Sequence, residues 1–152
     1  MRPFKFKLES LYRLKIFKME KTSIQLGGII NKINMMKNKI KKLNTYLQEE
    51  FNNYERMMDT RINARNIQLH PRLIDARRMQ IKKAEKNLAD LQKQYKLKKQ
   101  ELEKAKGEVK IMEKLKEDAY LKYKKKHNKK EEEDLEEINL MRFNGVNKYE
   151  DY

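Results

Sequence analysis

The sequence predicts an all-α protein, a long two-helix antiparallel coiled-coil hairpin. Three observations predict it: a heptad ladder, a charged composition with few helix breakers, and one interruption near the middle of the chain. In the ladder, nine of ten positions at alternating steps of three and four are apolar. Side chains at this spacing share one stripe of a helix, which must be buried against another helix. The ladder consists of Ile81, Ala84, Leu88, Leu91, Tyr95, Lys98, Leu102, Ala105, Val109 and Met112.

The composition supports a narrow helix–helix seam rather than a wide core. Charged residues make up 40% of the 152 residues, with 4 Gly, 2 Pro and no Trp. Because the chain has no Cys, disulfides and thiolate metal sites are excluded. The N-terminus has no apolar run that could form a signal peptide, and the longest uncharged stretch, Thr22 to Asn31, is about half of a membrane span. We therefore expect a cytoplasmic protein without a transmembrane segment.

The first half of the chain has a looser version of the same spacing. Apolar residues from Ile33 to Tyr54 follow steps of three or four, but several are doubled, as at Met35 and Met36. Methionine is flexible and tolerates imperfect packing, so we expect a helix of less regular register over about residues 5–62. The expected coiled-coil core comprises Ile33, Ile40, Leu43, Ile81, Leu88, Leu91, Tyr95, Leu102, Val109 and Met112.

The interruption lies around His70 and Pro71. A residue before proline is disfavoured in the α conformation, whereas proline itself fits the first turn of a helix. We expect a loop over about residues 63–71 with His70 as a turn residue, a second helix over about 72–141 that overhangs the first, and a flexible tail over 144–152. The whole chain, residues 1–152, is expected to be a single coiled-coil domain.

A short loop makes the two helices antiparallel neighbours. If the loop is centred near Ile67, the numbers of facing residues add to about 135, which places Gly27 and Gly28 opposite Gly107. Glycine weakens a helix, so the three could form a soft point, mark a close approach of the backbones, or coincide by chance.

No catalytic constellation is visible, so we expect no enzymatic activity, no cofactor and no metal. Glycine-rich phosphate-binding motifs are absent, and His70 and His127 are far apart. His127 lies among lysines and is expected to be exposed. The consecutive carboxylates Glu131 to Asp134 fan around a helix, and we expect a solvated face there rather than a cation site.

The formal net charge of +15 predicts an acidic partner. A basic block, Lys122 to Lys130, is followed directly by an acidic block, Glu131 to Glu137. Lysines interleaved with Tyr123 could bind nucleic acid. However, Tyr123 continues the seam and the basic block lacks arginine, the better base reader, so nucleic acid is the less favoured partner.

Both ends of the chain resemble the flagellar export protein FliJ family. Residues 3–15 read PFKFKLESLYRLK, similar to that family's opening run, and residues 135–143 read LEEINLMRF, similar to its closing segment. The resemblance implies a non-enzymatic central stalk and adapter of type III export. Such a stalk inserts into the hexameric flagellar export ATPase, promotes its assembly and activity, and links it to the cytoplasmic domain of the export-gate membrane protein. The family also handles export chaperones, at the cytoplasmic face of the inner membrane at the flagellar base.

The resemblance also implies contact residues. The ATPase ring would contact Leu8, Leu11, Leu14, Leu135, Ile138 and Arg142. The export gate would contact Leu47, Gln48 and Phe51, although only Gln48 and the bulky Phe51 fit the family's Tyr-Gln-x-x-Tyr pattern. Two alternatives remain: the equivalent stalk of a virulence type III secretion system, and a basic coiled coil that binds RNA or ribosomes.

Overall fold

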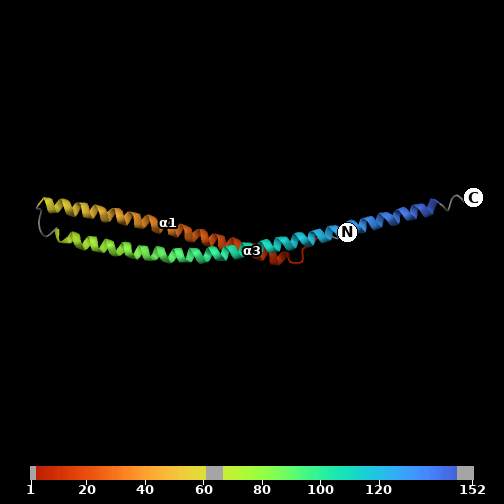
Figure 1. Cartoon of the computed structure of the whole chain (residues 1–152), viewed down its shortest axis with the longest axis horizontal. Helices are drawn as coiled ribbons and strands as arrows, with labels where there is room; N and C mark the ends of the chain where they lie inside the picture. Colours follow the sequence, from red (N-terminus) through yellow and green to blue (C-terminus); the bar gives the residue numbers. More distant parts are fainter. Residues whose placement is uncertain (1–2, 61–66, 147–152) are drawn as a thin grey trace, which may run out of the picture. The chain divides into compact units, whose positions relative to one another are not determined.

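The computed structural model describes residues 3–60 and 67–146, with side-chain burial through residue 143. Helix α1 spans Glu9–Asp59 and helix α3 spans Leu69–Val146 (Figure 1). No strand occurs in these two ranges. The predicted all-α hairpin of two packed helices is confirmed.

Helix α1 begins at Glu9, later than the expected residue 5. The N–H of Glu9 donates a hydrogen bond to the carbonyl of Phe6 (3.2 Å), which closes a turn just before the helix. Residues 3–8 are therefore not helical. The carboxylate of Glu9 lies in the first turn, where the positive end of the helix dipole stabilises its negative charge.

Helix α3 begins at Leu69, so the expectation that His70 is a turn residue is wrong. Pro71 is the third residue of the helix, where a missing N–H costs no intrahelical hydrogen bond. The conformational bias of His70 is outweighed by its contacts, since its Nδ1 lies 3.2 Å from Glu50 Oε2.

The far end also differs from expectation. Helix α3 continues to Val146, so the first three residues of the expected flexible tail are helical. Residues 147–152 of that tail, and residues 63–66 of the expected loop, lie outside the described residues.

The chain divides into two compact units. Unit 1 comprises Met1–Lys18 and Ala105–Tyr152, and unit 2 comprises Met19–Lys104. Both helices contribute a stretch to each unit. The buried and half-buried positions of α3 recur at steps of three or four from His70 to His127, which is the spacing of a coiled-coil seam.

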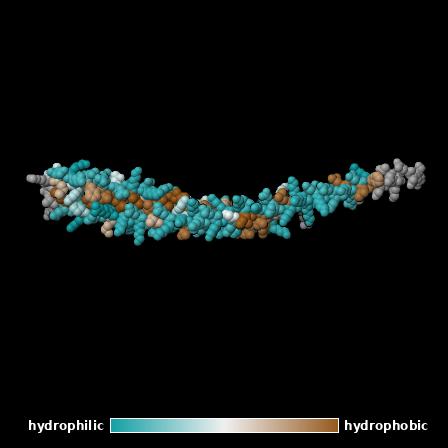
Figure 2. All heavy atoms as spheres, in the orientation of Figure 1, coloured by the Kyte–Doolittle hydropathy of each residue, from teal (hydrophilic) through white to brown (hydrophobic). Residues whose placement is uncertain are grey.

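The core of unit 2 is a narrow apolar seam. Leu43, Ile81 and Ala84 are buried together, with Ile40 and Leu47 packed against them. The remaining expected core positions lie on the same stripes: Ile33 and Leu102 are buried and Leu88, Leu91 and Tyr95 are half-buried in unit 2, and Val109 and Met112 are buried in unit 1. Most of the visible surface is hydrophilic, with hydrophobic side chains gathered in a few places (Figure 2).

The register of the hairpin differs from the expected one. In unit 2, the Tyr54 ring lies 6.3 Å from that of His70, and Arg77 lies over Tyr46. The residue numbers of these pairs add to 124 and 123, and those of the hydrogen-bonded pair Tyr12 and Glu113 in unit 1 add to 125. The expected value of 135 is wrong, because α1 ends at Asp59 and His70 is already paired with α1.

The register also overturns the expected pairing of glycines. Within unit 2, it places Gly27 and Gly28 opposite Leu97 and Lys96 rather than opposite Gly107. A Cβ atom added at Gly27, Gly28 or Gly107 would meet nothing within 4 Å. These glycines are therefore not required for a close approach of two backbones.

Candidate partner-binding surfaces

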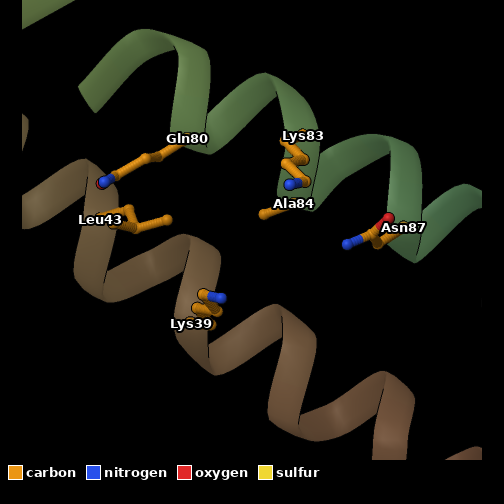
Figure 3. Close-up of a pocket in the computed structure, with 6 residues that line it drawn as sticks. All are labelled: Lys39, Leu43, Gln80, Lys83, Ala84 and Asn87. Carbon is orange, nitrogen blue, oxygen red and sulfur yellow. The ribbon is translucent and has the colours of Figure 1, made fainter. Parts of the chain in front are cut away.

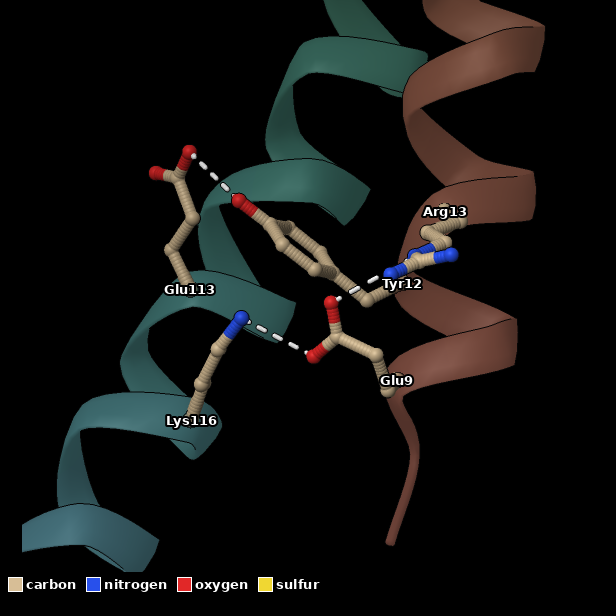
Figure 4. Close-up of polar contacts among 5 residues, drawn as sticks. All are labelled: Glu9, Tyr12, Arg13, Glu113 and Lys116. Carbon is tan, nitrogen blue, oxygen red and sulfur yellow. Dashed lines mark hydrogen bonds and ion pairs between the residues drawn. The ribbon is translucent and has the colours of Figure 1, made fainter. Parts of the chain in front are cut away.

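In unit 1, polar side chains join the first turns of α1 to α3. Lys116 Nζ lies 2.9 Å from Glu9 Oε2, and the Tyr12 hydroxyl donates a 3.4 Å hydrogen bond to Glu113 (Figure 4). Glu9 also pairs with Arg13 within α1, at 3.6 Å. These contacts give this part of the helix pair a polar rather than an apolar edge.

A second ion pair lies nearly two turns further along α1. Lys15 Nζ lies 2.6 Å from Glu108 Oε2. The hydrogen bond from Lys15 holds the pKa of the Glu108 carboxyl below its ordinary value, and the hydrogen bond from Lys116 does the same to the pKa of Glu9. Both carboxylates are therefore charged at neutral pH, and their pairs with lysine persist there.

An aromatic cluster lies where the N-terminal segment meets α3. The Phe4 ring lies 5.4 Å from Tyr120, nearly edge-on, and 5.5 Å from Tyr123. An open hollow of about 550 Å³ lies beside it; its lining residues are Phe4, Lys5, Phe6, Lys7, Leu8, Leu115, Ala119 and Tyr123. No local pattern in the sequence predicts this cluster, since Phe4 meets Tyr120 only through the hairpin register.

The residues expected to contact an ATPase ring are all exposed in unit 1, but they form two separate sets. Leu8, Leu11 and Leu14 are 42%, 40% and 62% exposed, at the start of the chain. The second set, Leu135, Ile138 and Arg142, lies on α3 and is also exposed.

Helix α3 extends well beyond the part that the N-terminal segment contacts. Phe4 already reaches Tyr123, and Leu135 lies twelve residues, about 18 Å, farther along α3. Every residue from 128 to 143 is exposed. We call residues 128–143 the overhang. The overhang thus presents a single helix with the apolar side chains of Leu135 and Ile138 open to solvent.

His127 lies where the half-buried stripe of α3 ends. The expectation that it is exposed is wrong, because its ring is half-buried and lies 6.0 Å from that of Tyr123. His127 Nδ1 also lies 3.4 Å from Glu131 Oε2. The spacing from Tyr123 could have predicted this position on the seam.

In unit 2, the residues expected to contact the export gate adjoin the start of α3. Leu47 packs on the core, and the exposed Gln48 donates a hydrogen bond to Asn52 Oδ1 (3.3 Å). Phe51 lies beneath the guanidinium of Arg78, 5.4 Å from the ring centre. The arginine was not predicted, since it reaches this ring from the other helix.

A lysine-rimmed hollow of about 330 Å³ lies over the core of unit 2. Leu43 and Ala84 come from facing helices, and Lys39 and Lys83 lie beside them (Figure 3). A second hollow of about 390 Å³ shares Lys39 and Leu43 and includes Tyr46. An apolar floor with ammonium groups at its rim suits an acidic protein segment with apolar side chains.

Two further structural findings concern chemistry and membranes. Across the described ranges, no three His, Cys, Asp or Glu side chains gather where they could hold a metal ion. No described helix is sufficiently long and apolar to span a bilayer.

Comparison with known proteins identifies a family. A family profile described as "Flagellar FliJ protein" matches residues 4–148, which is nearly the whole chain and covers the closing run and all but the first residue of the opening run. No curated protein and no solved structure matches the chain.

Proposed function

This chain belongs to the flagellar FliJ protein family, which makes it a component of flagellar protein export, and we propose that it is the non-enzymatic central stalk and adapter of the export apparatus. On this proposal it inserts into the hexameric export ATPase and promotes the assembly and activity of the ring. It also links the ring to the cytoplasmic domain of the export gate, at the cytoplasmic face of the inner membrane.

The observation that carries the ATPase contact is the overhang. Exposed Leu135 and Ile138, rimmed by acidic residues and Arg142, are typical of a surface that another protein covers. A single helix with its side chains is about 10–12 Å across, which is narrow enough for a ring lumen. Leu8, Leu11 and Leu14 would add contacts from the start of the chain.

A stalk of two helices lacks the sixfold symmetry of a hexameric ring, which supports a role in coupling. Such an object cannot contact six identical subunits equally, so it favours closure of some subunits over others through differential contact. The net charge of +15 would speed encounter with an acidic ring or partner.

Unit 2 is the proposed adapter surface. Leu47, Gln48 and Phe51 would contact the export gate, and the arginines beside Phe51 and Tyr46 would pair with acidic residues there. The lysine-rimmed hollows offer a related surface to export chaperones.

The test is the ATP hydrolysis rate of the cognate export ATPase, titrated with this protein, with ring assembly followed by light scattering. We expect saturable stimulation and more hexamer, both lost when the chain is truncated before Leu135. The half-maximal concentration should rise between about 50 and 500 mM salt, because exposed charges are screened. No stimulation at micromolar excess would reject the stalk.

A second candidate function rests on the exposed lysines of the basic block. Lys122, Lys124, Lys125 and Lys126 are all solvent-exposed and could bind RNA phosphates. Submicromolar RNA binding with a steep salt slope, together with no effect on the ATPase, would favour this function. The family match favours the flagellar stalk, both over RNA binding and over the stalk of a virulence secretion system.

A further inference from the structure

The overhang and the turns before it carry an unusual division of charge. The basic block, Lys122–Lys130, contains six lysines and no acid, and the acidic block, Glu131–Glu137, contains six carboxylates and no base. Both blocks lie on one continuous helix. Among the described residues, Lys129 pairs with Glu133, and His127 Nδ1 lies near the carboxylate of Glu131. Most of these charges therefore remain available to a partner.

We propose that residues 122–139 form a self-association surface, on which two copies of this chain pair in antiparallel orientation. An antiparallel pair sets the basic block of one copy against the acidic block of the other. A parallel, in-register pair would oppose like charges along the whole contact and is disfavoured. The symmetry axis passes between Lys130 of one copy and Glu131 of the other.

The seam of α3 agrees with this register. The half-buried stripe runs through Tyr123 and His127, and its next steps of three or four fall at Lys130, Asp134 and Ile138. With the axis beside Lys130, His127 faces Asp134 of the second copy and Tyr123 faces Ile138. The two Lys130 side chains flank the axis, each beside Glu131 of the other copy, so the opposite charges of the two blocks, rather than this stripe alone, carry the register.

The expected contact is short. Residues 122–139 give an overlap of eighteen residues, about 27 Å along the helix. The stretch is helical as a continuation of α3, so pairing does not have to nucleate a helix. Because the overlap is small and largely charged, we expect a weak, micromolar dimer that dissociates as salt rises.

Pairing would cover Ile138 and the neighbouring Leu135. If these residues contact the ATPase ring, a point that rests on the proposed function, the dimer is a form that cannot enter the ring. The self-association itself is measured on this protein alone, so its failure and the failure of the stalk role are distinguishable.

The first experiment is sedimentation velocity on the full chain and two charge-reversed variants. K124E/K125E/K129E reverses three of the six lysines, and E132K/E136K/E137K reverses the three carboxylates expected to face them. We expect each variant alone to raise the dissociation constant at least about tenfold, and an equimolar mixture to restore association to within about threefold of the wild type. Circular dichroism of each variant checks that α3 remains helical.

The second experiment determines whether the two paired helices are antiparallel or parallel. Because the chain has no cysteine, single labels can be placed at D118C and at N128C. In an antiparallel pair, the spin–spin distance between copies should be about 30 Å longer at 118 than at 128. Equal distances at the two sites would overturn the proposal. A monomer at about 200 μM in low salt, or a dimer indifferent to charge reversal, would overturn it as well.

Discussion

Units 1 and 2 are both built from a stretch of α1 packed on a stretch of α3, but the balance between apolar and ionic contacts differs. In unit 2, Leu43, Ile81 and Ala84 form a buried apolar cluster, and a contact between His70 and Glu50 lies near one end. In unit 1, buried Val109 and Met112 are accompanied by ion pairs and a hydrogen bond between the helices. Charge screening does not weaken apolar burial, whereas exposed ion pairs are weak and screened. The stability of unit 1, which holds the proposed ATPase contacts, should therefore depend more on salt than that of unit 2.

The largest expected effect is at the core of unit 2. Leu43→Ala should lower the free energy of unfolding by about 2–4 kcal/mol, because it removes buried methyl groups and leaves a cavity. Urea denaturation followed by circular dichroism measures it. Ile24→Ala, at a residue 76% exposed in the same unit, should change stability by less than about 0.5 kcal/mol. Equal losses for the two variants would contradict an apolar seam.

The next largest expected effect is an increase in the free energy of unfolding. Gly27→Ala with Gly28→Ala should raise the free energy of unfolding by about 1–2 kcal/mol, since alanine favours the helix and each new Cβ meets no atom. The same urea experiment measures it. Lys32→Gly, at an exposed site nearby in α1, is the reciprocal control and should lose about 1 kcal/mol. A loss on the double alanine substitution would mean that the glycines serve a packing role.

Salt should affect hydrogen exchange in the two units differently. At about 1 M salt, amide hydrogen exchange in residues 9–18 should accelerate, because screening weakens the pairs of Glu9 and Lys15. Exchange around Leu43 and Ile81 should be nearly unchanged. Equal acceleration in both regions would remove the distinction drawn between them.

The smallest effect is a pH dependence in unit 1. The pKa values of Glu9 and Glu108 are lowered in the folded protein, so their stabilisation is complete above the unfolded pKa, about 4.3, and is lost as pH falls through the lower folded value. Glu9→Gln should therefore speed exchange in residues 9–18 at pH 7. The difference from the wild type should disappear in strong acid.

The matched control for this pH effect is Glu117→Gln, at an exposed residue of unit 1. It should leave exchange in residues 9–18 unchanged at either pH. A difference between the wild type and Glu9→Gln that persists in strong acid would show that its cause is not the carboxylate charge.

The local features of the fold were predictable because they depend on spacing alone. The heptad ladder on residues 81–112 predicted a helix with one buried stripe, and α3 has that stripe. The register was not predictable, since it depends on where the chain turns and on His70 packing with Glu50 and Tyr54. The expected sum of facing residue numbers was too large by about ten, and this error had placed Gly27 opposite Gly107.

The same reasoning explains what could be said of the candidate surfaces. Leu135 and Ile138 follow the basic block on a helix longer than its partner, so an overhang was expected, and both residues are exposed. The Phe4–Tyr120 contact and the Arg78–Phe51 contact join residues far apart in the chain. Such pairs follow from the register and not from any local pattern.

The most direct test of the stalk role compares two double variants in the ATP hydrolysis assay. Leu135→Ala with Ile138→Ala removes exposed apolar side chains from the overhang, and Ile24→Ala with Met79→Ala removes even more exposed ones from unit 2. The stalk role predicts that the first pair raises the half-maximal concentration for stimulation about tenfold or more, and that the second leaves it unchanged. Equal stimulation by both variants would contradict it.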